Sequence, residues 1–275
     1  MHEQPREERA SVRGGSLIAI LALCALAAGC SRAAPSHGAA APASSPVGAY
    51  LAPPQLTTAV RQARATSLSG TATPGSVIRL ASPDGSTITG PVDRGGGWRL
   101  SAPLGDGPRL YSLSETLGGR LVRATGYLAV LPSPGPAAAM LHPAAAAAMT
   151  PSDPERGITA IDYDSSGAAV ASGRAAPGEA IRLELDGAEA GDDRADTRGM
   201  FSAVLSRPLS AGAHGLRATG QHLQAGVAFA AAPPAHVATP PFAAQRVDGA
   251  WRIDWTPPGG GVQSTLLFDH KGARP

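Results

Sequence analysis

Residues 69–80 read Ser-Gly-Thr-Ala-Thr-Pro-Gly-Ser-Val-Ile-Arg-Leu, and the chain repeats this pattern once. Residues 172–183, which begin 103 positions later, read Ser-Gly-Arg-Ala-Ala-Pro-Gly-Glu-Ala-Ile-Arg-Leu. The Ser, Gly, Ala, Pro, Gly, Ile, Arg and Leu of the first copy all recur at the same offset. So many identities within one short window indicate a duplicated structural unit.

Each copy has the chemistry of two strands joined by a tight turn. Pro74 fixes φ near the value required at the second position of a turn, and Gly75 accepts the positive φ of the third position. The runs 77–80 and 180–183 are rich in residues that favour strands, and their side chains alternate between two faces. The sequence therefore predicts a reversal at each Pro-Gly pair, followed by a strand.

Further matches extend both copies. Asp-Gly pairs at 84–85 and 186–187 lie between apolar runs, which is a strong short-range signal for a hairpin. The stretch 93–98 corresponds to 196–201, and each ends in one large aromatic residue, Trp98 or Phe201. An inward aromatic that fills a sandwich core explains both residues better than ligand stacking does.

This order of turns resembles the bacterial immunoglobulin-like repeats of cell-envelope and surface proteins. The resemblance covers residues 56–132 and 158–233, and a prealbumin-like sandwich is the nearest competing family. It implies an all-β fold, with two tandem immunoglobulin-like β-sandwiches and a short C-terminal β-hairpin segment. A signal peptide and a disordered tether are expected to precede them.

The N-terminal region has the pattern of a targeting sequence. Arg6, Arg9 and Arg13 precede an apolar run at 17–28, which is shorter than the about 20 residues of a membrane-spanning helix. Residues 26–30, Leu-Ala-Ala-Gly-Cys, resemble a lipobox, although Ala27 stands where that pattern prefers Leu. Residues 1–29 are thus predicted to be a lipoprotein signal peptide, with an ordinary secretory peptide as the alternative.

The resemblance to a lipobox makes Cys30 the predicted lipidation site and a lipid anchor the predicted link to the membrane. The expected location is the cell envelope, and Ser31 favours the outer membrane over the inner one if the cell is Gram-negative. The chain has two cysteines, Cys24 and Cys30, so the mature domains would contain no thiol and no disulfide.

Three stretches poor in periodic pattern divide the rest of the chain. Residues 30–55 are dominated by Ala, Pro, Ser and Gly, a composition that cannot bury enough apolar surface to fold. Residues 133–157 and 234–241 have a similar composition and are predicted to be linkers. The expected domains are therefore 56–132, 158–233 and a small C-terminal segment, 242–275.

The C-terminal segment is predicted to be a β-hairpin that turns at residues 247–250. Trp251, Ile253 and Trp255 would share one face of its strand, with Arg252 and Asp254 on the other. Because an isolated two-stranded ribbon is marginal in water, this aromatic face is expected to dock on the second domain. In the alternative, Trp251 and Trp255 are exposed ligand-stacking residues that bind sugar rings.

Signals for catalysis or metal binding are weak. The net charge of +2 is too small for nucleic-acid binding, and the basic residues are scattered. The acidic cluster at 186–196 and the loop at 162–167 resemble calcium sites only in part, so polar turns explain them better, and no metal or cofactor is predicted. His214 and His222 could approach each other across a hairpin, but without metal-ligand spacing.

We therefore expect no enzyme, but an anchored envelope protein with a structural, scaffolding or adhesion role. The alternative is a module that binds peptidoglycan or exopolysaccharide, and the third possibility is an accessory enzyme whose site is too dispersed to recognise. The expected partners are the membrane, through the lipid anchor, and envelope proteins or glycan.

Overall fold

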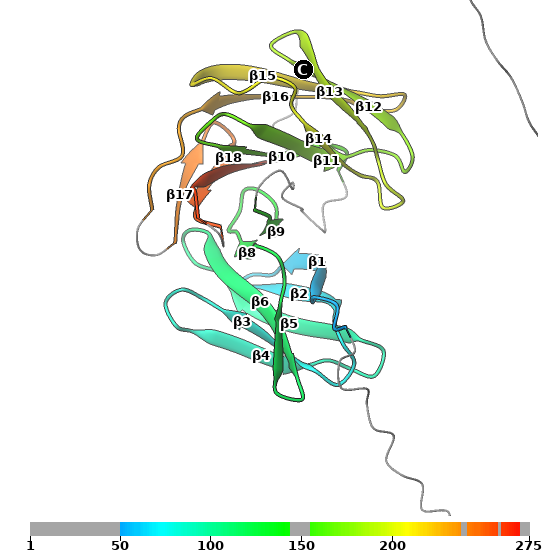
Figure 1. Ribbon diagram of the computed structural model, residues 1–275, viewed down its shortest axis with the longest axis vertical. Coiled ribbons are helices and arrows are strands. Elements are labelled where there is room, and N and C mark those ends of the chain that lie inside the picture. Colours follow the sequence, from blue (N-terminus) through cyan, green and yellow to red (C-terminus); the bar gives the residue numbers. More distant parts are fainter. Residues whose placement is uncertain (1–49, 144–154, 238–240, 258–259, 270–275) are drawn as a thin grey trace, which may run out of the picture. The chain divides into compact units, whose positions relative to one another are not determined.

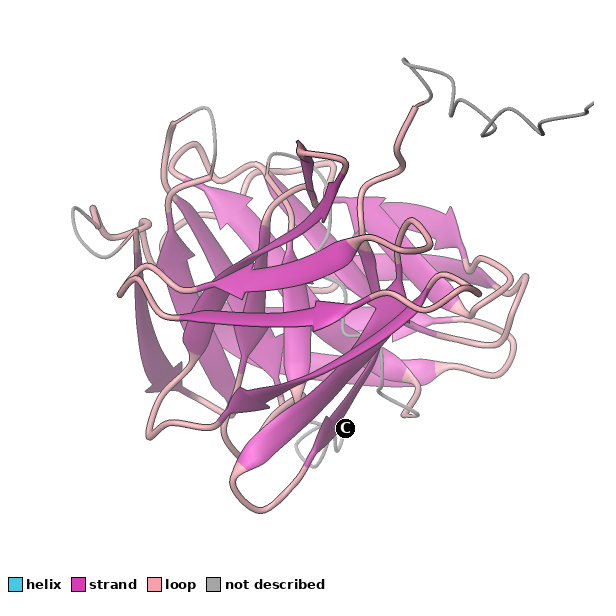
Figure 2. Ribbon diagram, turned by 90° about the horizontal axis from the view of Figure 1, so that it is seen from below, coloured by secondary structure: helices cyan, strands magenta, loops and turns pink. Residues whose placement is uncertain are grey.

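The computed structural model describes residues 50–143, 155–237, 241–257 and 260–269, which belong to one compact unit, Tyr50–Pro275 (Figure 1). All regular elements of these residues are strands paired in antiparallel sheets, and none of the described residues is helical (Figure 2). The predicted all-β sandwich fold is confirmed. The predicted signal peptide, Cys30 and most of the tether lie outside the described residues.

The first sandwich packs a three-stranded sheet on a six-stranded one. The smaller sheet has the order β1-β2-β5, and the larger has the order β4-β3-β6-β8-β9, with β7 paired to β6. The strands are β1 (Gln55–Arg61), β2 (Ala65–Thr71), β3 (Val77–Ala81), β4 (Thr87–Pro91), β5 (Gly97–Pro103), β6 (Arg109–Leu117), β7 (Arg120–Arg123), β8 (Tyr127–Val130) and β9 (Ala138–Leu141). Leu68 and Trp98 from one sheet meet Ile78, Leu80 and Leu113 from the other in a buried core.

The second sandwich has sheets of four and six strands, in the orders β13-β12-β15-β16 and β14-β11-β10-β19-β18-β17 (Figure 1). Its strands are β10 (Gly157–Asp164), β11 (Ala169–Arg174), β12 (Ala180–Leu185), β13 (Ala188–Arg194), β14 (Met200–Val204), β15 (Gly212–Thr219), β16 (Gln224–Ala231), β17 (Phe242–Val247), β18 (Ala250–Trp255) and β19 (Gln263–Phe268). Ile161 and Phe201 pack on Ile181, Leu183 and Leu216 between the two sheets.

The duplicated stretch has the same local structure in both sandwiches. A bulge interrupts the pairing of β1 with β2 and that of β10 with β11. Gly70 lies under the ring of Trp98, and Gly173 lies under that of Phe201, so close that an added Cβ would be 2.6 Å or 2.5 Å from a ring carbon. The aromatic residues thus fill equivalent core positions that require glycine beneath them.

Two segments differ from the sequence-based domain boundaries. The predicted linker 133–157 contains β9, which pairs with β8 and extends the first sandwich beyond residue 132. In the C-terminal segment, β17 and β18 form the predicted hairpin, and because β19 pairs with β10 the segment adds three strands to a sheet of the second sandwich. In the first sandwich, β1 corresponds to β10 and is the edge strand of its sheet. In the second sandwich, the three added strands continue the sheet beyond β10.

Candidate functional site

The most distinctive site is an apolar contact between the two sandwiches, which we call the junction. On β8 and β9, successive residues alternate between the core of the first sandwich and this second cluster. On β19, Leu266 and Phe268 face the core of the second sandwich and Leu267 faces the junction, and on β18 every second residue, Trp251, Ile253 and Trp255, faces the junction. The buried junction residues are Leu110, Ala129, Leu131, Ala139, Leu141, Ala160, Trp251, Ile253, Trp255 and Leu267.

Trp255 is the largest fully buried residue of the junction and is 0% exposed. Its indole Nε1 donates a hydrogen bond to Thr265 Oγ1 at 3.1 Å, and its ring meets that of Tyr127 edge-on at a centroid distance of 5.8 Å. A buried indole that has both an edge-to-face partner and a hydrogen-bond acceptor is well stabilised. Trp255 therefore belongs to the interior of the molecule.

Trp251 lies at the border of the junction and is 7% exposed. Its Nε1 donates to the carbonyl of Pro134 at 3.0 Å, and the guanidinium of Arg246 lies 5.2 Å from the ring centroid. Arg246 also forms a two-pronged ion pair with Asp269, with distances of 3.0 and 2.5 Å. A Cβ on Gly135 would lie 3.2 Å from both Trp251 and Asp269, so this glycine allows the close approach.

The loop that receives Trp251 is held by Arg61 at the end of β1. The Arg61 guanidinium donates hydrogen bonds to the carbonyls of Leu131, Pro132, Gly135 and Pro136, at distances between 2.8 and 3.4 Å. Partial burial lowers the pKa of this guanidinium from its usual value. One side chain thus satisfies several carbonyls of a loop that has no regular pairing of its own.

The opposite face of β18 carries a buried polar network. Arg252 Nε donates to Asp254 Oδ1 at 2.9 Å, and Ser264 Oγ donates to the same carboxylate oxygen. Arg252 Nη2 donates to the carbonyl of Pro233 at 2.8 Å. The strand is thus buried on both faces, and its charged residues are paired inside the protein, as buried charges must be.

The residues predicted to stack on sugars are therefore in the junction. A ring that binds a sugar needs an exposed face, and neither Trp251 nor Trp255 offers one. Their packing matches the docked alternative in part, since they contact the first sandwich as well as lying in a sheet of the second.

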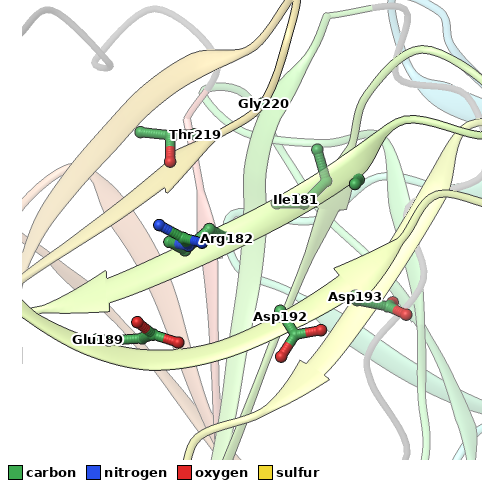
Figure 3. Close-up of a pocket in the computed structure, with 8 residues that line it drawn as sticks. Ile181, Arg182, Glu189, Asp192, Asp193, Thr219 and Gly220 are labelled. Atoms are coloured by element: carbon green, nitrogen blue, oxygen red, sulfur yellow. The ribbon is translucent and has the colours of Figure 1, made fainter.

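The acidic cluster at 186–196 lies along β13 and its flanking turns. Glu189, Asp192 and Asp193 border an open hollow that Arg182 and Thr219 also line (Figure 3). Asp193 Oδ2 accepts a hydrogen bond from Ser202 N at 2.6 Å, and Asp196 Oδ1 accepts from Arg198 N and Met200 N at 2.8 Å. Among the described residues, no group of three or more metal-ligating side chains comes together.

Asp186 and His214 form a separate pair at the end of this sheet. His214 Nδ1 lies 2.8 Å from Asp186 Oδ2, and the other ring nitrogen lies 2.9 Å from the Ser210 carbonyl. Burial by itself lowers the pKa of His214, but its hydrogen bonds to Asp186 and Ser210 outweigh burial and raise the pKa. The bond from Gly215 N, followed by that from His214, lowers the pKa of Asp186. The predicted approach of His214 to His222 has no counterpart in these contacts.

The other predicted loop is a turn. Asp164 Oδ1 accepts hydrogen bonds from the backbone N–H groups of Ser166 and Ala168, at 2.8 and 3.2 Å. Asp162 lies on β10 and accepts a 2.5 Å hydrogen bond from the hydroxyl of Thr265 on β19. Asp164 thus stabilises a turn, whereas Asp162 links β10 to β19.

The two sandwiches carry opposite charge, which the small total conceals. Between residues 50 and 143 the sequence has eight arginines and four acidic residues. The described residues from 155 to 269 have nine arginines and thirteen acidic residues. The charge is thus about +4 in the first sandwich and −4 in the second, taking histidine as neutral.

Comparisons with known proteins place few constraints on function. No family model and no curated protein matches the sequence. Among solved structures, a chain described as the BSP domain of a biofilm associated protein matches with a TM-score of 0.23 and 14% identity. The match covers 63% of this chain and 28% of that one, so the chain spans little more than a quarter of its neighbour. Within the described residues, no helix is long and apolar enough to cross a bilayer.

Proposed function

We propose that this chain is a non-enzymatic, lipid-anchored protein of the cell envelope, in which the two sandwiches act together as one structural or adhesive unit. The observation that carries the proposal is the junction, because it joins the two sandwiches through a shared apolar contact. The proposal has two parts, the coupled sandwiches and the anchor, and each has its own support.

The coupled sandwiches are suited to holding a fixed geometry. Separating them would expose Trp255, Ile253 and Leu141, each of which is 0% exposed in the structure. Burial of one such side chain contributes about 1.5–3 kcal/mol, so the contact outweighs thermal energy severalfold. The Arg61-held loop and the bond from Trp251 to Pro134 add directional contacts to this apolar surface.

The anchor is supported by the sequence alone. Cys30 closes the stretch that resembles a lipobox, and 19 residues lie between it and Tyr50, the first described residue. The Ala-, Pro- and Ser-rich composition of these residues is the one that predicts a tether. Such a tether keeps the sandwiches near the membrane to which the lipid is attached.

The experiment that tests both parts complements a strain that lacks the protein. Envelope resistance to detergent and attachment of intact cells to a surface are measured together with membrane fractionation. Wild type and the matched control Cys24→Ala should be found in the membrane fraction and should restore detergent resistance or surface attachment. Cys30→Ala should be unlipidated and should not restore it. If an unlipidated chain restores function fully, an anchored scaffold is excluded, because that behaviour belongs to a soluble catalyst or binder.

A further inference from the structure

The outer face of the larger sheet in the first sandwich is covered along only part of its length. On β6, Leu110 points into the junction, and alternation puts Ser112, Ser114 and Thr116 on the same face. Beyond the junction this face continues over β3, β4 and β7, where the outward residues are largely exposed. This uncovered area is the surface of interest.

Strand register arranges the uncovered area in rows. Val77 pairs with Pro91 on one side and with Thr116 on the other, and Thr116 pairs with Leu121. Val77 and Leu121 are each 46% exposed, and they are two of five large hydrophobic residues that are exposed among the described residues. One row of the face is therefore apolar and open to solvent.

The neighbouring row is basic. Arg79 pairs with Thr89 and with Ser114, and Ser114 pairs with Arg123. Both arginines are exposed, and no carboxylate of the described residues forms an ion pair with either. Glu115, the acidic residue of β6, points into the core, so it does not offset this charge at the surface. We call the two rows together the basic face.

The second sandwich provides an internal comparison. Arg182 occupies the position of Arg79 in the repeat, but on β12 it is opposite Asp192, and Glu189 and Asp193 line the same hollow. Figure 3 shows Arg182 between these acidic side chains on one side and Thr219 on the other. The same arginine thus lies beside carboxylates in one sandwich and is opposite only hydroxyl residues in the other.

We infer that the basic face binds the surface of a membrane that contains anionic lipids. Guanidinium groups attract lipid phosphates, and the adjacent Val77 and Leu121 can enter the interfacial region, whereas these rows offer no aromatic ring on which a sugar could stack. The anchor of the proposed function would raise the local lipid concentration, but the face itself does not depend on it.

The test uses the unlipidated chain, residues 31–275, so its outcome is independent of Cys30. Sedimentation with vesicles rich in phosphatidylglycerol should carry the protein down, and pure phosphatidylcholine vesicles should not. Binding should weaken as salt rises, because exposed charges are screened. Each arginine near such a surface is worth about 1 kcal/mol, or roughly fivefold, so Arg79→Ser with Arg123→Ser should weaken binding about 25-fold.

Matched variants separate binding by the basic face from general attraction between any arginine and an anionic surface. Arg182→Ser removes the equivalent arginine of the second sandwich and should leave vesicle binding unchanged. Val77→Ser with Leu121→Ser should weaken binding while retaining its salt dependence, and thermal melts check that each variant is folded. The inference is overturned if wild type ignores anionic vesicles, or if the double arginine variant binds as wild type does. Binding through the same arginines to a soluble acidic polysaccharide, without vesicle binding, would assign the face to a glycan instead.

Discussion

In both sandwiches, the Pro-Gly turn is held by a hydrogen bond from a backbone N–H to a glutamate carboxylate, but the glutamate comes from a different part of the chain in each. In the first sandwich, the backbone N–H of Thr73 donates at 2.8 Å to Glu115 Oε2, and this carboxylate comes from β6, across the sheet. In the second, Ala176 occupies the position of Thr73, and its N–H donates at 3.0 Å to Glu179 Oε2, which belongs to the turn itself. The repeat has preserved the interaction and not the residue that makes it.

Where one copy has the glutamate, the other has a small residue, and this holds at both positions of the pair. Ser76 stands where the second copy has Glu179, and its hydroxyl donates at 2.9 Å to Glu115. Because Arg79 is opposite Ser114 and Arg182 is opposite Thr219, Gly220 stands where the first copy has Glu115. A Cβ on Gly220 would lie 2.5 Å from Glu179 Oε1, so the glycine makes room for the relocated carboxylate. Two positions at which the repeats differ can therefore be linked, because the change at one position compensates for the change at the other.

The largest expected effect comes from Trp255, which lies in a sheet of the second sandwich and packs on the first at the junction. Trp255→Ala should lower the free energy of unfolding by about 3–5 kcal/mol, because it leaves a cavity in the junction. Hydrogen exchange measured by mass spectrometry should show lost protection in β8 and β9 of the first sandwich as well as in β10 of the second. Val204→Ala, at an exposed site, is the control. Loss confined to the second sandwich would show that the junction does not couple the two.

The next change tests whether the glycine under the core aromatic residue contributes equally to the stability of the two sandwiches. In Gly70→Ala and Gly173→Ala, the new Cβ would lie 1.9 Å from the Gln55 carbonyl and 2.1 Å from the Gly157 carbonyl. Both substitutions should cost about 1–3 kcal/mol by overpacking, and by similar amounts, in denaturant unfolding. Gly215→Ala, whose Cβ would meet no atom within 4 Å, should have little effect. A large difference between the first two variants would contradict the equivalence.

Converting one turn into the other tests the exchange directly. Glu115→Gly should cost about 1–3 kcal/mol, because half-buried Thr73 and buried Ser76 lose their acceptor. Ser76→Glu alone would place a second carboxylate beside Glu115, and like charges repel. The double variant reproduces the second copy and should be more stable than the two single effects predict, by about 0.5–3 kcal/mol. Strict additivity in urea unfolding would show that the two positions are independent.

The smallest effect concerns pH. The hydrogen bond from His222 N, followed by that from Ala176 N, holds the pKa of Glu179 below its usual value of 4.5. A carboxylate with a depressed folded pKa contributes stability that is complete above the unfolded value and is lost as pH falls through the folded one. The stability advantage of wild type over Glu179→Gln should therefore be constant near neutral pH and disappear in acid. An advantage that persists at low pH would show that the carboxylate charge is not its source.

The sequence predicted the parts of the fold that depend on neighbouring residues. The Pro-Gly turns, the Asp-Gly hairpins and the inward Trp98 and Phe201 follow from backbone preferences and alternation, and a second copy reinforces each signal. The turn at 247–250 was predicted in the same way, and Asp248 and Gly249 there have φ values of 32° and 76°. Such features can be recognised without knowledge of strand partners.

Pairing between distant strands was not predictable. β10 and β19 pair across more than a hundred residues, as Asp162 and Thr265 illustrate, and no local pattern specifies such a partner. β9, with the sequence Ala-Ala-Met-Leu, lies in an Ala- and Pro-rich stretch that resembles a linker. Alternation correctly separated Trp251 from Arg252 but could not show that both faces of β18 are buried. The basic face was missed because it combines residues of strands that only the folded sheet brings together.

The position of β19 has a consequence for biogenesis. This strand lies between β10 and β18, yet the ribosome makes it after every other strand of the described residues. During synthesis, β10 therefore has an unpaired edge, and the junction lacks Leu267, until residues 263–268 have emerged. A message truncated before Gln263 would produce a chain with this edge of β10 exposed, and unpaired strand edges make incompletely folded chains prone to aggregation. Pairing of β10 on both sides is thus conditional on translation having reached the last strand of the described residues.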